Sequence, residues 1–230
     1  MTLQEAIKQR HSVRRYVHKP LSAEIVETLR KKIEECNAEG GLHIQLVTNE
    51  TRAFTGLFSY GKFSGVENYI VMVGKKADDL DERVGYYGEQ LVLLAQTLGL
   101  NTCWAGLSYR RVDEAYSVGD DEKLTCMIAL GYGATQGHKR KSKTAEQVSN
   151  ISSDSPEWFR KGVEAVLMAP TAINQQKFSF TLLPNEQDTE DKPKVLAKRG
   201  FSMVGYTKMD IGIARLHFEI GAGTENFDWA

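Results

Sequence analysis

The chain has 230 residues, of which 41% are hydrophobic and 26% charged, and its formal net charge is −1 at pH 7. This length allows one large domain or two smaller halves, and the near-neutral charge gives no reason to expect nucleic acid or an anionic membrane as a partner. No apolar run approaches the ~20 residues of a membrane span, and the polar N-terminus does not resemble a signal peptide. Three cysteines without CxxC or Cys/His spacing argue against a disulfide framework or zinc site. We therefore expect a cytoplasmic protein in which Cys103 and Cys126, which lie in apolar surroundings, are core thiols.

The first part of the chain alternates helical and strand patterns. Thr2 and Glu5 have the spacing of a capping box before a short helix over 3–10, and Ser22 precedes a second helix. Apolar periodicity then predicts strands over 42–47 and 69–73, a long helix over 82–98 that ends at Gly99, and a strand over 125–130.

The second part follows a polar stretch over 136–155, the one linker that the sequence predicts. Beyond it we expect a helix over 156–168, a strand over 178–183, a helix over 209–220 and an apolar tail that docks on the core. The order helix, strand, loop and helix thus occurs twice, which predicts an internal repeat with halves 1–145 and 146–230.

A basic cluster, Arg-His-Ser-Val-Arg-Arg-Tyr over 10–16, follows the first helix. Arg10 and Arg14 could bind a phosphate through bidentate hydrogen bonds, and Ser12 could add a hydroxyl. The alternative is that Arg10 only complements the end of the helix and the other cations are solvated.

A second basic stretch over 138–143 follows the third predicted strand. Lys141 and Lys143 could approach the same phosphate from the opposite side. A charge run of this kind is otherwise a solvated loop.

Residues 169–176, Ala-Pro-Thr-Ala-Ile-Asn-Gln-Gln, connect a predicted helix to a predicted strand. Pro170 ends the helix, so Thr171, Asn174 and the exposed backbone could face the edge of a flat heterocycle. An ordinary helix-to-strand turn uses the same residue types.

Residues 99–107 form the third candidate segment. Ala105 and Gly106 are small enough for the backbone to approach a planar ring, and Trp104 precedes them. The alternative is that Trp104 fills the core. The sequence has no GxGxxG after a strand, no GxxxxGK[ST], no GxSxG and no metal-like histidine spacing, so those readings lack support.

Together these segments resemble the FMN-dependent nitroreductase superfamily. The basic cluster resembles its phosphate-binding opening, residues 88–107 its long core helix and the loop over the flavin N5, residues 130–143 its closing strand and second basic pair, and residues 169–176 its [AS]-P-[ST]-[AS]-x-N-x-Q motif. The resemblance implies an α+β fold with a central, mostly antiparallel sheet flanked by helices.

The order of the motifs departs from the family pattern. Ordinary members carry the Pro/Asn motif early and use it toward the flavin of a partner subunit, whereas residues 33–40 here lack it. The second half has that motif but no basic cluster. The resemblance thus implies two unequal, pseudo-symmetric halves, the second mimicking a partner subunit, so that a monomer could hold one intact site, while a homodimer stays open.

By this resemblance the protein would bind FMN and pass hydride from NADH or NADPH to a small-molecule acceptor such as a nitroaromatic or a quinone, with no catalytic side chain and no metal. The expected FMN contacts are Arg10, Ser12, Arg14, Trp104, Ala105, Gly106, Lys141, Lys143, Pro170, Thr171 and Asn174. A family Asn at the pyrimidine edge would be replaced by Gly61. Dehalogenation or flavin cleavage, a non-catalytic flavin carrier or sensor, and a cofactor-free interaction module are the alternatives.

Overall fold

The computed structural model describes residues 1–56, 62–137, 140–184 and 192–230; Gly61 and His138 lie outside the described residues. The elements before the polar stretch are α1 (Leu3–Gln9), α2 (Ala23–Gly40), β1 (Gln45–Val47), β2 (Asn68–Lys75), α3 (Leu80–Thr97), β3 (Asn101–Ala105) and β4 (Glu122–Gly131). Those after it are α4 (Glu157–Val166), β5 (Phe178–Leu182), β6 (Lys194–Arg199), α5 (Thr207–Ala222) and β7 (Asp228–Trp229).

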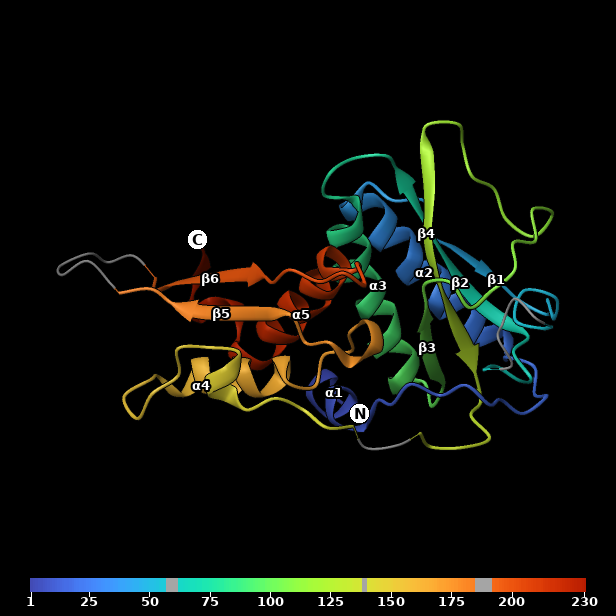
Figure 1. Ribbon diagram of the computed structural model, residues 1–230. Coiled ribbons are helices and arrows are strands. Elements are labelled where there is room, and N and C mark those ends of the chain that lie inside the picture. The colour runs from blue at the N-terminus through green and yellow to red at the C-terminus, as the bar shows by residue number, and fades with distance from the viewer. Residues whose placement is uncertain (57–61, 138–139, 185–191) are drawn as a thin grey trace.

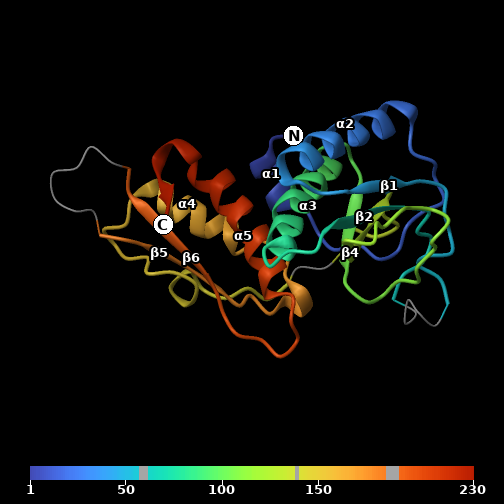
Figure 2. The ribbon, with the colours of Figure 1, turned by 90° about the horizontal axis from the view of Figure 1, so that it is seen from above.

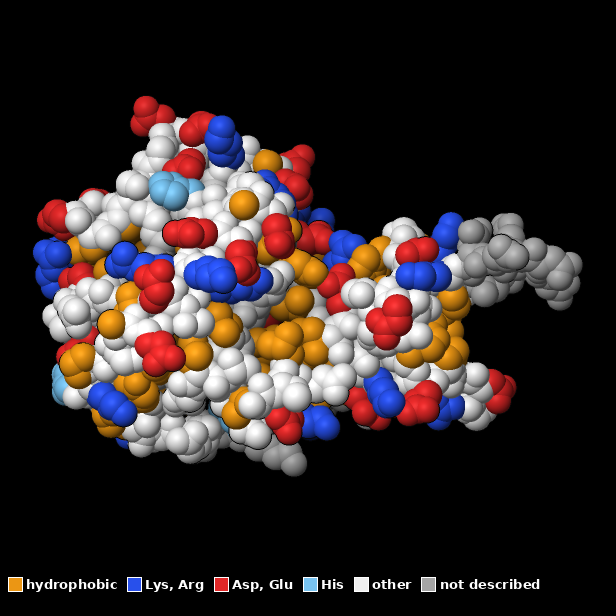
Figure 3. All heavy atoms as spheres, turned by 180° about the vertical axis from the view of Figure 1, so that it is seen from behind, with side chains coloured by type: hydrophobic (Ala, Val, Ile, Leu, Met, Phe, Trp, Pro, Cys, Tyr) orange, Lys and Arg blue, Asp and Glu red, His pale blue; other side chains and the backbone are white. Residues whose placement is uncertain are grey.

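The helices and strands form two lobes that meet along α3 and α5 (Figures 1 and 2). The larger lobe contains an antiparallel sheet in the order β1-β2-β4-β3. The smaller lobe contains a second sheet, β5-β6-β7, in which β5 and β6 are antiparallel and β6 and β7 parallel. On the face in Figure 3, charged side chains of both signs are interspersed, as the small net charge leads one to expect.

The four-stranded sheet is buried on both faces. Ile70 and Met72 of β2 belong to one core with residues of α2 and α3, whereas Tyr69 and Val71 face a second core that contains Phe54. Since successive side chains of a strand point to opposite faces, this double burial explains why β2 is apolar throughout rather than alternating.

Two glycines bring α3 and α5 into close contact. A Cβ atom on Gly85 would lie 2.1 Å from the carbonyl oxygen of Met209, and a Cβ atom on Gly212 would lie 2.0 Å from that of Glu82. The two contacts are reciprocal: each glycine of one helix meets the carbonyl three residues before the glycine of the other. Any larger residue would force the helices apart.

The smaller lobe has an aromatic core that includes the C-terminal tail. Phe180 of β5 stacks on Phe218 of α5, with ring centroids 5.1 Å apart, and Trp158 of α4 stacks on Phe227 at 5.7 Å. Phe227 is only 4% exposed. The predicted docking of the tail on the core is confirmed.

The predicted helices and all four predicted strands agree with the structure to within three residues at each end, which is the ordinary uncertainty of predicted boundaries. The strand predicted over 42–47 is shorter, because β1 begins at Gln45. The capping box at Thr2 and the Ser22 N-cap are both present. Cys36, Cys103 and Cys126 are buried free thiols, and burial raises the pKa of each.

The predicted α+β fold with mostly antiparallel strands flanked by helices is confirmed, but the prediction of one central sheet is wrong, because the strands divide between two sheets. Strand β6 was missed since three of its six residues are Lys or Arg, and β3 was taken for a loop because small residues and glycines surround it. The predicted linker is partly packed: Val148 is fully buried, and its carbonyl accepts a hydrogen bond from Phe180 of β5. Within the described residues, no helix is both long and apolar enough to span a membrane.

Candidate functional site

A cleft in two parts lies where the lobes meet. The inner cavity, about 130 Å³, is lined by residues of β3, β4, α5 and the segment 170–173; the outer cavity, about 440 Å³, lies toward α1 and the basic cluster. Five residues line both parts, namely Ser12, Arg14, Pro170, Thr171 and Ile173. The two cavities are therefore neighbouring parts of one cleft, which could take an elongated ligand.

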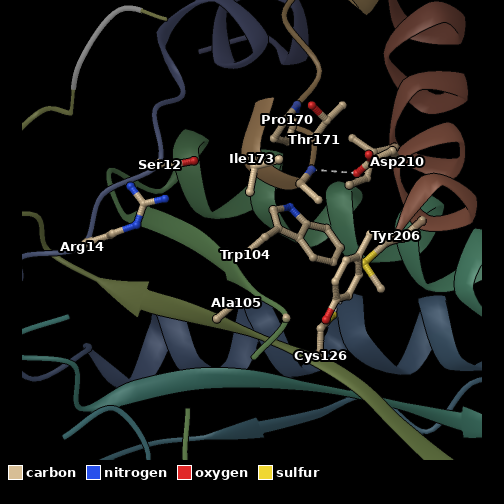
Figure 4. Close-up of a pocket in the computed structure, with 14 residues that line it drawn as sticks. Ser12, Arg14, Trp104, Ala105, Cys126, Pro170, Thr171, Ile173, Tyr206 and Asp210 are labelled. Carbon is tan, nitrogen blue, oxygen red and sulfur yellow. Dashed lines mark hydrogen bonds between the residues drawn. The ribbon is translucent and has the colours of Figure 1, made fainter. Parts of the chain in front are cut away.

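The cleft is built from segments that are far apart in the sequence. Figure 4 shows Ser12 and Arg14 from the N-terminal segment, Trp104 from β3, Pro170 to Ile173, and Tyr206 and Asp210 around the start of α5, all converging on the inner cavity. The structure thus brings residues 10–16 and 169–176 together, as the sequence predicted for a shared ligand.

Backbone pairing with β3 fixes the basic cluster. The Val13 N–H donates to the Thr102 carbonyl at 3.0 Å, and the buried Tyr16 hydroxyl donates to the Val13 carbonyl at 2.6 Å. Because Val13 and Tyr16 are buried, Ser12 and Arg14 are turned toward the cleft.

Two arginines lie close together at the outer cavity. Arg10 is 8% exposed, and its Nε is buried 3.7 Å from Glu89, without a hydrogen-bond partner among the described residues. Arg140 donates to the Leu167 carbonyl at 2.8 Å. Burial, and next to it the charge of Arg10, lower the pKa of Arg140 to about 10. This end of the cleft therefore carries an excess of positive charge, which an anion would relieve.

Lys141 and Lys143 do not line either cavity. The Lys143 ammonium donates to the Gln176 carbonyl at 2.5 Å, and Lys141 contributes its carbonyl, which accepts from Asn174 at 2.8 Å. Their neighbours Arg140 and Ser142 line the outer cavity instead. The basic stretch thus reaches the outer cavity through Arg140 and Ser142, and phosphate binding by Lys141 and Lys143 stays a prediction.

The backbone of residues 171–176 is strained. Ile173, Asn174 and Gln176 have φ values of 46°, 59° and 46°, in the left-handed region that residues other than glycine rarely adopt, least of all a β-branched one. Side-chain hydrogen bonds hold this shape: the Thr171 hydroxyl accepts from the Gln176 N–H at 3.1 Å, and the Gln176 amide oxygen accepts from the Lys143 N–H at 3.0 Å. Strain of this kind is typical of functional sites.

A buried polar network lies behind the inner cavity. Glu89 of α3 is fully buried; one carboxylate oxygen accepts from the Trp104 indole N–H at 2.9 Å, and the other lies 3.0 Å from Nε2 of His217, which is also fully buried. Trp104 therefore does more than fill the core: its hydrogen bond to Glu89 fixes the indole ring beside the inner cavity. The sequence gave no sign of this network, since its members lie on α3, β3 and α5.

Comparison with protein families shows which family the chain belongs to. Residues 2–222 match the family described as "Putative TM nitroreductase". The chain belongs to this family. By family it is an oxidoreductase, in agreement with the resemblance of its motifs.

Solved structures agree with this family assignment at the level of the fold. A protein described as a "putative nitroreductase" from Thermotoga maritima is 23% identical, with a TM-score of 0.62 over 96% of this chain and 83% of that one. Nitroreductase A from Vibrio parahaemolyticus is 16% identical, with a TM-score of 0.53 over 68% of this chain and 79% of that one. A "putative nitroreductase" from Desulfovibrio desulfuricans, solved in complex with FMN, is 16% identical, with a TM-score of 0.52 over 68% and 99%. No curated protein matches the chain.

In this TM nitroreductase family member, the cleft gathers nine of the residues that the sequence singled out. They are Arg10, Ser12, Arg14, Trp104, Ala105, Gly106, Pro170, Thr171 and Asn174. Tyr206 and Asp210 were missed, because they lie at a helix start without a recognisable motif. Gly106 explains the place of Tyr206: a Cβ atom there would lie 2.5 Å from the Tyr206 hydroxyl oxygen.

Asp210 gives a testable effect of pH on stability. Burial raises the pKa of Asp210 from 3.8 to about 6, despite hydrogen bonds from Ala172 and Gln175 that favour the charged form. A carboxyl group with a raised folded-state pKa stabilises the fold most below its unfolded pKa, and that stability is lost as the pH rises to about 6. We expect Asp210→Asn to raise the free energy of unfolding by about 2 kcal/mol at pH 7.5 and by nothing at pH 4. Urea unfolding at both pH values would measure this, and an equal effect at both would contradict it.

Proposed function

We propose that the protein is an FMN-dependent oxidoreductase that passes hydride from NADH or NADPH to a small acceptor such as a nitroaromatic or a quinone. The observation that supports this most is the two-part cleft, cationic at its outer end and lined by aromatic and small residues at its inner end. FMN has the matching two parts, since it carries a phosphate at one end of a short chain and a flat ring system at the other.

The residues present fit FMN. At the outer end, Arg10 and Arg140 lie near each other, and burial, together with the charge of Arg10, lowers the pKa of Arg140. At the inner end, the lining is mostly uncharged, and the backbone at Gly106 is free of a side chain. An anion is favoured at the first and a planar ring at the second.

On this proposal, Arg10, Arg14 and Arg140 hold the phosphate, with Ser12 and Ser142 as hydroxyl donors. Arg140 and Ser142 take the roles that the sequence suggested for Lys141 and Lys143. Trp104, Ala105 and Gly106 lie beside the ring, and Pro170, Thr171 and Asn174 approach it from the second half of the chain.

The cofactor would supply the chemistry: FMN, when bound, would take a hydride from the nicotinamide and pass it on to the acceptor. The protein supplies shape and charge. Trp104, fixed by Glu89, and Tyr206, packed on Gly106, form rigid walls that exclude water from the inner cavity. The open rim at Ile173, which is 77% exposed, leaves room for exchange of donor and acceptor.

We also propose that the halves 1–145 and 146–230 are related by an internal pseudo-two-fold axis between α3 and α5. The reciprocal contacts of Gly85 and Gly212 support it, because a two-fold axis produces such paired contacts. Equating Gly85 with Gly212 also pairs four residues at the start of α3 with four residues that line the inner cavity. The pairs are Asp79 with Tyr206, Glu82 with Met209, Arg83 with Asp210, and Tyr86 with Ile213.

The four residues of this set that belong to the first half line a second, separate hollow. They are Asp79, Glu82, Arg83 and Tyr86, and the hollow is completed by Tyr87, Gly212 and Arg215. There, Arg83 pairs with Asp79 at 3.0 Å and Arg215 pairs with Glu82 at 2.8 Å, so the charges are satisfied within the protein. Arg83 donates to the carbonyls of Gly40 and Gly41 at the end of α2, whereas Asp210 accepts from the segment of the Pro/Asn motif, so the end of α2 takes the place of that motif. We infer that this second hollow no longer holds a flavin, and that the chain binds one FMN.

A non-catalytic flavin carrier or sensor is the alternative. It would use the same cleft but would not oxidise nicotinamide. Steady-state oxidation of NADH or NADPH with menadione as acceptor separates the two functions.

The proposed function predicts that the purified protein is yellow, with one FMN per chain by absorbance, and that NADPH or NADH bleaches it. Apoprotein should recover the spectrum when FMN is added. Protein that binds no added FMN would refute the proposal, bleaching without turnover would favour the carrier, and two FMN per chain would contradict the loss of the second site.

A further inference from the structure

Asp210 is a carboxylate in the wall of the inner cavity, and it is only 2% exposed. One carboxylate oxygen accepts from the Ala172 N–H at 2.9 Å, as the dashed line in Figure 4 shows, and the other accepts from the Gln175 side-chain amide at 2.7 Å. Both donors lie in the segment 171–176, so a single side chain of α5 binds this segment twice.

Gln175 extends the connection to the loop before α5. Its amide nitrogen donates to Asp210 and also to the Gly205 carbonyl at 3.0 Å, so both of its N–H groups are used. Its amide oxygen is buried and has no hydrogen-bond partner among the described residues. Turning the amide to accept a proton from Asp210 would remove the donor from Gly205, so this arrangement favours an ionised carboxylate.

The segment held in this way is the strained one. Ile173, Asn174 and Gln176 have positive φ values, and strained backbone persists only where its surroundings hold it. Thr171 and Ile173 line both cavities, so the shape of this segment decides the shape of the cleft.

We propose that Asp210 is a positioning residue: its carboxylate holds residues 171–176 in the ligand-binding shape, and without that carboxylate the segment loosens and the cleft loses affinity. This extends the proposed function in one respect, since FMN would be the ligand affected.

The first test measures the segment without any ligand. Hydrogen exchange of the Ala172 amide at pH 7.5 should show at least about tenfold less protection in Asp210→Asn than in the wild-type protein, since a charge-assisted hydrogen bond is lost. Equal protection in the two proteins would overturn the proposal.

The second test measures binding of FMN at pH 7.5 by quenching of its fluorescence. Asp210→Asn should bind FMN about tenfold more weakly than the wild-type protein does. Glu157→Gln, which replaces an exposed carboxylate on α4, should bind FMN as the wild type does. An unchanged affinity in Asp210→Asn would overturn the proposal. If wild-type protein binds no FMN, the proposed function fails, and the exchange experiment still decides the role of Asp210.

Discussion

Replacing Arg140 with methionine should weaken FMN binding by about 10- to 100-fold, because a charge-assisted hydrogen bond to phosphate contributes roughly 1.5–3 kcal/mol. The fold should not suffer equally. Arg140 is partly buried beside Arg10, and both its burial and the charge of Arg10 lower its pKa. Removal of one of the two charges should therefore stabilise the ligand-free protein. Loss of affinity with equal or higher stability is the expected signature of a residue kept for binding.

Riboflavin provides the ligand control, since it has the ring system and ribityl chain but no phosphate. Its affinity should be the same in wild-type protein and in Arg140→Met. Arg160→Met is the matched protein control: its guanidinium also donates to a backbone carbonyl, that of Ser155, but it lies on α4. Equal losses for FMN and riboflavin would show that Arg140 shapes the cleft without contacting phosphate.

The second large effect concerns the junction of the lobes. We expect Gly85→Ala and Gly212→Ala each to lower the free energy of unfolding by about 3 kcal/mol or more, because the added methyl group would overlap a backbone carbonyl. Alanine is otherwise favoured over glycine within a helix by about 1 kcal/mol, so a loss of stability isolates the clash. Chemical unfolding of both variants measures it.

Gly200→Ala is the control, because the nearest atom to its added Cβ would be at an ordinary 3.5 Å. If α3 and α5 are related by a pseudo-two-fold axis, the two helix variants should cost similar amounts. Their effects should also be less than additive in the double variant, since the first substitution already separates the helices. A neutral effect of either variant would show that the helices can slide apart freely.

Much of this architecture could be predicted from local patterns. Thr2 and Ser22 mark helix starts because their side chains accept hydrogen bonds from N–H groups of the first helical turn. Pro170 marks the limit of the helix before it, because proline cannot continue a helix. The segments 10–16 and 169–176 carry functional groups in a recognisable order. Their meeting in one cleft could be inferred only from the family resemblance, because nothing local encodes a contact over that separation.

The rest of the site depends on tertiary structure. Asp210 is an unremarkable acid in a helical pattern, and only the packing of α5 places it against Ala172. Glu89 looks like a solvent-facing residue until His217 and Trp104 surround it. Lys141 and Arg140 have the same charge, and which of two neighbours faces a cavity depends on how the segment is anchored. Strand β6, rich in lysine and arginine, is recognisable only once β5 lies beside it.

The cleft draws its two sides from distant parts of one polypeptide, and this changes how the protein can evolve. In a symmetric assembly of identical chains, every substitution appears at two equivalent places, so one side of a site cannot change without the other. On the proposed pseudo-symmetry, Arg83 and Asp210 occupy corresponding positions in the two halves, and each can be altered without the other. The two sides of the cleft also remain at a fixed effective concentration, so dilution does not separate them. A covalent connection thus does here what mass action does between separate chains, and it leaves each side free to specialise.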